Sequence, residues 1–255
     1  MEQNKPFNEP VSKKEFNGYW IPKHNAKVIK SSIEKNNAPF LPDQNGQIKA
    51  EPIFNATTGY CIDSTRLIPL QIKKNENGYN SNFVATKTSM NINNAVLNPD
   101  EKGVFYNFKS DDGKFHSAAY FFPEQTSNPE SIIQFGNKNK RDFYGNLADK
   151  AIIIDNSNPE EYLGKYFAAC RSGAKLTVSR EVASEFKDKM MIILNDELLH
   201  EKGKERSNPS LHTTLFNAGI KSNDIIKSLS TEKKIEQTQQ PKKATHRRDD
   251  EGICF

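Results

Sequence analysis

Aromatic and apolar residues gather in two short runs on either side of a polar turn in the first half of the chain. Residues 104–109 and 115–122 are each predicted to be a strand, and the five residues between them include Asp112 and Gly113, which are typical of a tight turn. These segments predict a β-hairpin. Its two faces differ because neighbouring side chains of a strand point in opposite directions.

In the second half, the apolar residues recur every three or four positions, which is the period of a helix. Residues 179–202 show it most clearly, at Val182, Phe186, Met190, Ile193 and Leu194. A helix over 159–171 is predicted by Asn158 as N-cap and Pro159 in the first turn, and a third helix falls between 208 and 229. Residues 151–155 predict a short strand before them.

The remaining patterns of the first half are shorter. A helix is predicted over 24–35, and Pro39 and Pro42 prevent it from continuing. Residues 67–72 fit either a helix with Pro69 in its first turn or a buried strand. Residues 55–59 form a turn sequence that ends in Gly59.

The composition supports one large or two small domains. The chain has 255 residues, of which only 35% are hydrophobic. We therefore predict an α+β fold made of an N-terminal mixed domain with a β-hairpin, a mainly helical region and a disordered tail. The predicted bounds are a flexible lead-in over 1–18, the mixed domain over 19–135, the helical domain over 136–230 and the tail over 231–255.

Charge and cysteine content narrow the function classes. The 36 basic and 32 acidic residues give a net charge of only +4, so any nucleic-acid site depends on local arrangement rather than on bulk charge. The three cysteines form no CxxC pair, which argues against a zinc ribbon. No signal peptide and no apolar run long enough for a membrane span are visible, and a bacterial cytoplasmic location is expected.

An ordered series of short motifs runs from Ile33 to Ile132. It begins with Ala38-Pro39-Phe40, Asn55-Ala56-Thr57-Thr58-Gly59 and Leu67 to Leu70. It continues with Gly78-Tyr79-Asn80-Ser81, Thr86 and Glu101-Lys102-Gly103, directly before the hairpin. In order and spacing this series resembles the N-terminal domain of ArdC-type antirestriction proteins, which are associated with plasmid transfer. The resemblance implies binding of single-stranded DNA. Several positions depart from the family pattern, among them Ile62, Val84 and Arg66.

The second half lacks the other hallmark of that family. ArdC-type proteins carry a metallopeptidase-like domain with an H-E-x-x-H helix, whereas here His200-Glu201 is followed by Lys204 at the position of the second histidine. We therefore expect no catalytic residues, no metal site, no cofactor and no enzymatic activity.

The candidate nucleic-acid-binding residues follow from three kinds of chemistry. Exposed rings stack on unpaired bases, lysines contact phosphates, and an arginine can pair with a phosphate through two bonds. Each has a simpler alternative: a core ring, a solvated lysine, or a structural ion pair for Arg66. Together with the motif positions, the candidates are Phe40, Asn55, Thr58, Arg66, Tyr79, Thr86, Lys87, Lys102, Tyr106, Phe108 and Lys109.

Two functions remain open at this level. The first is a protein that binds single-stranded DNA without strong sequence preference, in antirestriction or conjugation. The second is a bacterial interaction protein, or an effector translocated by a type IV system into a recipient or host cell, built on a repurposed copy of the same domain. In the second, the helical region or the C-terminal tail would bind a protein partner.

Overall fold

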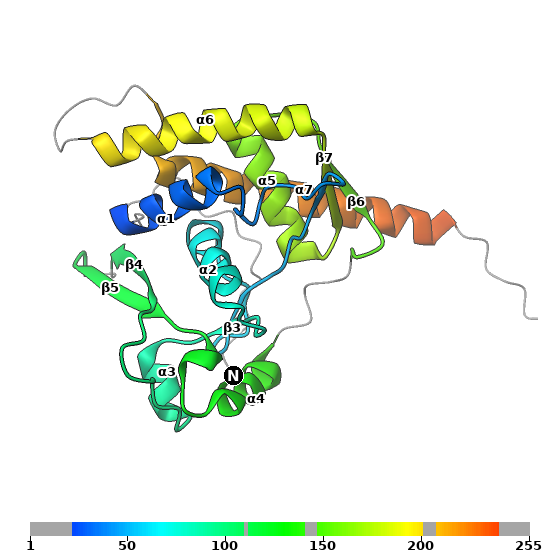
Figure 1. Cartoon of the computed structure of the whole chain (residues 1–255). Coiled ribbons are helices and arrows are strands. Elements are labelled where there is room, and N and C mark those ends of the chain that lie inside the picture. The colour runs from blue at the N-terminus through cyan, green and yellow to red at the C-terminus, as the bar shows by residue number, and fades with distance from the viewer. Residues whose placement is uncertain (1–21, 110–111, 141–146, 201–207, 240–255) are drawn as a thin grey trace, which may run out of the picture.

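The computed structural model describes residues 22–109, 112–140, 147–200 and 208–239. Within these residues the chain is a mixed α+β fold, as the sequence predicts (Figure 1). The elements in chain order are α1 (Lys23–Glu34), β1 (Gln47–Ile48), β2 (Phe54–Asn55), α2 (Ser64–Asn77), β3 (Phe83–Val84), α3 (Lys87–Ile92), β4 (Val104–Lys109), β5 (Phe115–Tyr120), the 3-10 helix η1 (Pro123–Gln125), α4 (Pro129–Asn139), β6 (Ala151–Ile154), α5 (Pro159–Ser172), β7 (Lys175–Val178), α6 (Arg180–Leu199) and α7 (Leu211–Gln239).

The strands form three small sheets. In the largest, β7 is central, with β6 parallel to it on one side and β1 antiparallel on the other. The strands β2 and β3 pair in parallel, and β4 and β5 form the predicted antiparallel hairpin. The return strand ends at Tyr120 rather than at Phe122, because Phe121 leaves the hairpin and bridges to Ala85.

The main core brings distant parts of the sequence together. The ring of Tyr162 on α5 stacks on Phe186 of α6 with 3.7 Å between centroids, and its hydroxyl donates to the carbonyl oxygen of Phe40 at 2.9 Å. The ring of Phe40 meets Phe186 edge-on at 5.7 Å. Residues on both sides of position 135 therefore share this core.

Local signals place the helices that the sequence predicts. Asn158 caps α5 by accepting from the backbone N–H groups of Glu160 and Glu161, and Ser179 caps α6 in the same way. The ambiguous apolar segment 67–72 is helical. Asp63 caps α2 one residue before Ser64, so Pro69 lies in the second turn and not in the first.

Several elements differ from the sequence prediction. The helix α4 and the strands β1, β2, β3 and β7 were not predicted. Helix α7 continues past Leu229, where the predicted helix ends, to Gln239. Glu, Lys and Gln, which dominate 232–239, have high helix propensity, and a helix already nucleated on the core extends readily through them. The part of the predicted tail beyond Gln239, and the predicted lead-in, lie outside the described residues. No helix in the described segments is long and apolar enough to cross a membrane.

Candidate nucleic-acid interface

One face of the hairpin carries a continuous row of rings. The register pairs Val104 with Tyr120 and Phe108 with His116, so these residues and Tyr106 share one face. Tyr106 stacks on Tyr120 with 4.7 Å between centroids and lies 6.0 Å from Phe108. The ring of Phe108 stacks on His116 at 5.3 Å. We call Phe108, His116, Tyr106 and Tyr120 the ring row.

Exposure changes along the ring row. Tyr120 is buried, Tyr106 and Phe108 are partly exposed, and His116 is exposed. On the opposite face of the hairpin, Phe105 is 52% exposed. The hairpin therefore presents aromatic surface to solvent on both faces.

Arg66 contacts the ring row. It belongs to the first turn of α2, and its guanidinium carbon is 5.0 Å from the ring centre of Tyr106 and 5.7 Å from that of Tyr120. The guanidinium forms an ion pair with Asp63 and also donates to the hydroxyl of Tyr120 at 3.2 Å. Arg66 thus makes the structural ion pair that the sequence left as an alternative, and it supports the rings by a cation–π contact.

The same ion pair shifts the titration of Asp63. Partial burial works to raise the pKa of its carboxyl group, but the charge of Arg66 and hydrogen bonds from Arg66 and Thr65 outweigh it, so the net pKa lies below the ordinary 3.8. A carboxylate with a lowered folded-state pKa stabilises the fold at neutral pH, and this stabilisation is lost as the pH falls through the lowered value.

We expect Asp63→Asn to remove that pH-dependent term while keeping an N-cap for α2, because asparagine caps as well as aspartate. The side chain of Asp63 is 43% exposed, so solvent screening should limit the loss at pH 7 to under about 1 kcal/mol. Urea unfolding at pH 7 and near pH 2 measures it. The gap between wild type and variant should close in acid, and an equal gap at both pH values would contradict the prediction.

The turn 55–59 lies beside the ring row. Asn55 accepts from the backbone N–H of Thr57 at 2.9 Å and of Thr58 at 3.4 Å, and its amide donates to the hydroxyl of Tyr120 at 3.5 Å. Thr58 is exposed. Asn55 therefore shapes the turn and connects it to the hairpin, whereas Thr58 is open to a ligand.

Thr86 and Lys87 begin helix α3. The hydroxyl of Thr86 accepts from the backbone N–H of Ser89, and Lys87 is the exposed first residue of the helix. The hydroxyl groups of Ser89 and Thr57 lie 2.6 Å apart. That contact brings the start of α3 next to the turn.

The prediction that Phe40 binds nucleic acid is wrong. Its ring is fully buried between Tyr166 and Phe186, so it offers no stacking surface. Nothing local distinguishes this ring from Tyr106, because its partners lie more than 100 residues away along the chain.

The other candidates are spread around the hairpin. Tyr79 is partly buried against Phe122, with 5.1 Å between centroids, and burial, together with the charges of Glu101 and Glu124, raises the pKa of its hydroxyl. Lys102 is exposed just before β4. The side chain of Lys109 lies outside the described residues.

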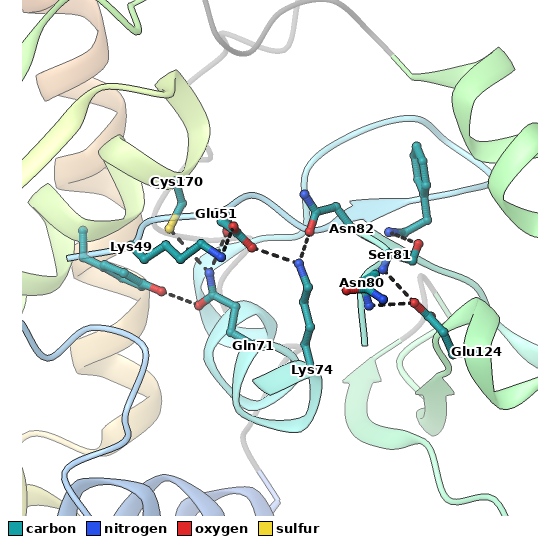
Figure 2. A network of polar contacts seen from close by, with 11 residues as sticks. Lys49, Glu51, Gln71, Lys74, Asn80, Ser81, Asn82, Glu124 and Cys170 are labelled. Atoms are coloured by element: carbon teal, nitrogen blue, oxygen red, sulfur yellow. Dashed lines mark hydrogen bonds and ion pairs between the residues drawn. The ribbon is translucent and has the colours of Figure 1, made fainter. Parts of the chain in front are cut away.

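A polar network that the sequence did not reveal connects α2 to the neighbouring loops (Figure 2). The ammonium group of Lys74, which is buried, bonds to the carboxylate of Glu51 at 2.9 Å and to the side chain of Asn82. One carboxylate oxygen of Glu124 accepts from the backbone N–H groups of Asn80 at 2.9 Å and Ser81 at 2.7 Å. These bonds hold the segment 80–82 against α2 and η1, and so position the strand β3 that follows.

The metal-binding question concerns the end of α6. His200 follows that helix directly, whereas residues 201–207 lie outside the described residues. In the parts of the chain that the structure describes, no group of three His, Cys, Asp or Glu side chains is placed to hold a metal ion.

Comparison with known proteins shows a similarity of fold. No family model and no curated protein matches the sequence. Among solved structures, the chain is similar to the metal-free crystal structure of the antirestriction ArdC protein from plasmid R388, with a TM-score of 0.50 and 11% sequence identity. The match covers 82% of this chain and 96% of that chain, so the similarity of fold extends beyond residues 33–132 into the second half.

Proposed function

We propose that the protein binds single-stranded DNA, without strong sequence preference, on the β4–β5 hairpin. The observation that carries the proposal is the ring row, in which the partly exposed rings of Tyr106 and Phe108 lie 6.0 Å apart. Rings arranged in this way provide a platform for successive bases, and every base has a face that can stack.

The contacts that order the rings matter as much as their exposure. Tyr106 stacks on Tyr120 at 4.7 Å and contacts the guanidinium of Arg66 at 5.0 Å, and Phe108 stacks on His116 at 5.3 Å. A ring that is already ordered loses little conformational entropy when a base stacks on it. This arrangement favours a binding role for the two rings over a purely structural one.

The cations near the hairpin suit a nucleic-acid backbone. Lys102 precedes β4 and Lys114 precedes β5, and both are exposed, although Lys114 also pairs with Asp112 at 2.9 Å. Lys87 is exposed at the start of α3. The preference for a single strand follows from the rings, because the bases of a duplex are already stacked on each other and cannot lie on a side chain.

Tyr106→Ala provides the test, with Tyr106→Phe as the variant that keeps the ring. We expect Tyr106→Ala to weaken binding of a fluorescent single-stranded oligonucleotide by about 5- to 150-fold, the equivalent of 1–3 kcal/mol per stacked base, and Tyr106→Phe to bind nearly as wild type. Fluorescence anisotropy titrations at two or more salt concentrations measure both.

Ile153→Ala is the matched control, because it removes an exposed apolar side chain, 66% accessible, from β6 instead of the hairpin. It should leave the affinity unchanged. Equal binding by wild type and Tyr106→Ala would contradict the role of the ring row. A wild-type Kd no better than about 100 μM at low salt would contradict DNA binding altogether.

Antirestriction is the biological setting that we propose for this binding. The solved structure with a similar fold bears that description. The test is plasmid recovery after conjugation into a restricting and a non-restricting host, with wild-type protein and with Tyr106→Ala. Full protection by Tyr106→Ala would show that antirestriction does not depend on the ring row.

We further propose that the protein acts by binding and not as a metallopeptidase. Lys204 occupies the place of the second histidine of an H-E-x-x-H motif, and an ammonium group does not bind zinc at neutral pH. Elemental analysis of the purified protein should find well under one zinc ion per chain, and a stoichiometric zinc content would overturn this part of the proposal.

A further inference from the structure

Helix α4 ends against the turn 55–59. The side chain of Asn139, the last residue of the helix, donates to the carbonyl oxygen of Ala56 at 2.9 Å. A Cβ at Gly59 would lie 1.8 Å from the carbonyl oxygen of Asn139 and 3.2 Å from the backbone nitrogen of Lys140. The backbone of Lys140 is therefore in direct contact with the turn.

The side chain of Lys140 places a positive charge at this contact. Its ammonium nitrogen lies 4.9 Å from the ring centre of Phe54, the residue directly before the turn. Phe54 is buried whereas Lys140 is exposed, so a ligand can reach the lysine of this pair but not the ring. An ammonium group carries several N–H donors and the ring lies on only one side of it, so donors remain for phosphate oxygens.

Helix α3 begins next to the same turn. The hydroxyl groups of Thr57 and Ser89 lie 2.6 Å apart, and Lys87 is exposed two residues before Ser89. Thr57 and Thr58 are exposed as well. Lys87 and Lys140, which are far apart in sequence, thus belong to elements that contact one short turn.

The segments that meet at this turn carry almost no acidic side chains. Residues 54–62 have no charge, α3 contains no acid, and the single acid of α4 is Glu130 in its first turn, at the opposite end of the helix from Lys140. Asp63, the next acid along the chain, forms its ion pair with Arg66. A local excess of positive charge of this kind attracts phosphate groups.

The turn is bonded to the ring row. The side-chain amide of Asn55 donates to the hydroxyl of Tyr120 at 3.5 Å, and Tyr120 stacks on Tyr106 with 4.7 Å between centroids. The turn therefore connects the buried end of the ring row, where Tyr120 lies, to the start of α3 and the end of α4.

We infer that the turn 55–59, with Lys140 and Lys87, binds phosphates of the single strand whose bases stack on the ring row. The inference rests on the proposed function, and it adds Lys140, which lies outside the motif series from Ile33 to Ile132. The rings contact bases and the lysines contact the backbone, so the two surfaces bind different parts of one strand.

Removal of the charge of Lys140 tests the inference. Lys140→Met keeps the aliphatic part of the side chain against Phe54. Lys175→Met, at an exposed position on β7, is the control because it changes the net charge by the same amount. We expect Lys140→Met to weaken binding of a single-stranded oligonucleotide at least about threefold at about 50 mM salt, and Lys175→Met to bind nearly as wild type. Thermal melts followed by circular dichroism check that both variants are folded.

The salt dependence separates a phosphate contact from a structural effect. Each phosphate contact on a single strand contributes about 0.7 to the slope of log K against log salt, so Lys140→Met should reduce the slope by about that amount. Lys140→Arg keeps the charge and should keep the slope. Lys87→Met is an independent variant at an exposed position and should also reduce the slope. Unchanged slopes for both Lys140→Met and Lys87→Met would overturn the inference.

An oligonucleotide without bases separates this inference from the proposed function. Such a strand keeps its phosphates, so Lys140→Met should still weaken its binding, whereas Tyr106→Ala should not. If Tyr106→Ala weakens binding of an ordinary strand while the two lysine variants leave the slope unchanged, the ring row stands and the phosphate site is wrong. If the wild type binds no single-stranded DNA at all, the proposed function fails and the phosphate site fails with it.

Discussion

Gly59→Ala is expected to destabilise the protein by about 3 kcal/mol or more. Gly59 has φ of +70°, a conformation that residues with a Cβ rarely adopt. A Cβ at this position would also lie 1.8 Å from the carbonyl oxygen of Asn139 at the end of α4. The side chain of Asn139 donates to the carbonyl oxygen of Ala56 at 2.9 Å. Moving the end of α4 away from the turn to make room for the Cβ would break this hydrogen bond.

Gly78→Ala separates the two contributions. Gly78 ends α2 with φ of +65°, nearly the same backbone conformation, but nothing lies within 4 Å of a Cβ there. It should cost only the backbone term, about 1 kcal/mol. Urea unfolding followed by circular dichroism gives both free energies, and equal losses for the two variants would show that the contact with α4 contributes nothing.

The second large effect is expected at Phe186. Phe186→Ala should lower the free energy of unfolding by about 4 kcal/mol. The variant loses the contacts of the ring with Tyr162 at 3.7 Å and Phe40 at 5.7 Å, and it leaves a cavity that the surrounding helices cannot close. The ring is fully buried, and it joins the segment after α1 to helices α5 and α6.

Ile192→Ala on the same helix is the control. Ile192 is 55% exposed, so its truncation should change the free energy of unfolding by no more than about 0.5 kcal/mol. Thermal or urea unfolding measures both. A loss for Phe186→Ala as small as that for Ile192→Ala would contradict the assignment of Phe40, Tyr162 and Phe186 to one core.

Much of the local structure follows from residues that are close in sequence. The hairpin depends on two short runs rich in aromatic residues and on a turn that includes Gly113, whose φ is +81°. Helix α5 depends on Asn158 and Pro159 at its start and on Gly173 at its end. These signals act over a few residues, and therefore they are readable without the fold.

Elements without such a signal were missed. The strand β7 (Lys175–Val178) is only four residues long and is defined by pairing with β6 and with β1, which lies more than 120 residues earlier in the chain. Helix α4 was missed although Asn128 and Pro129 begin it correctly, because Gly136 and several asparagines weaken its helical pattern. Gly136 is required by packing: a Cβ there would lie 2.6 Å from the ring of Phe83.

For the candidate interface, the sequence predicts that Phe105 lies on one face of a hairpin and the pair Tyr106 and Phe108 on the other, because side chains alternate along a strand. Which of these rings reach solvent depends on tertiary packing. Phe40 and Tyr106 are both aromatic residues in a polar half of the chain, yet Phe40 is enclosed by α5 and α6 while Tyr106 stays partly open. Burial depends on partners that are distant in sequence and that only the folded chain brings together. The bond of Arg66 to Tyr120 and the bond of α1 to β4 depend on such partners as well.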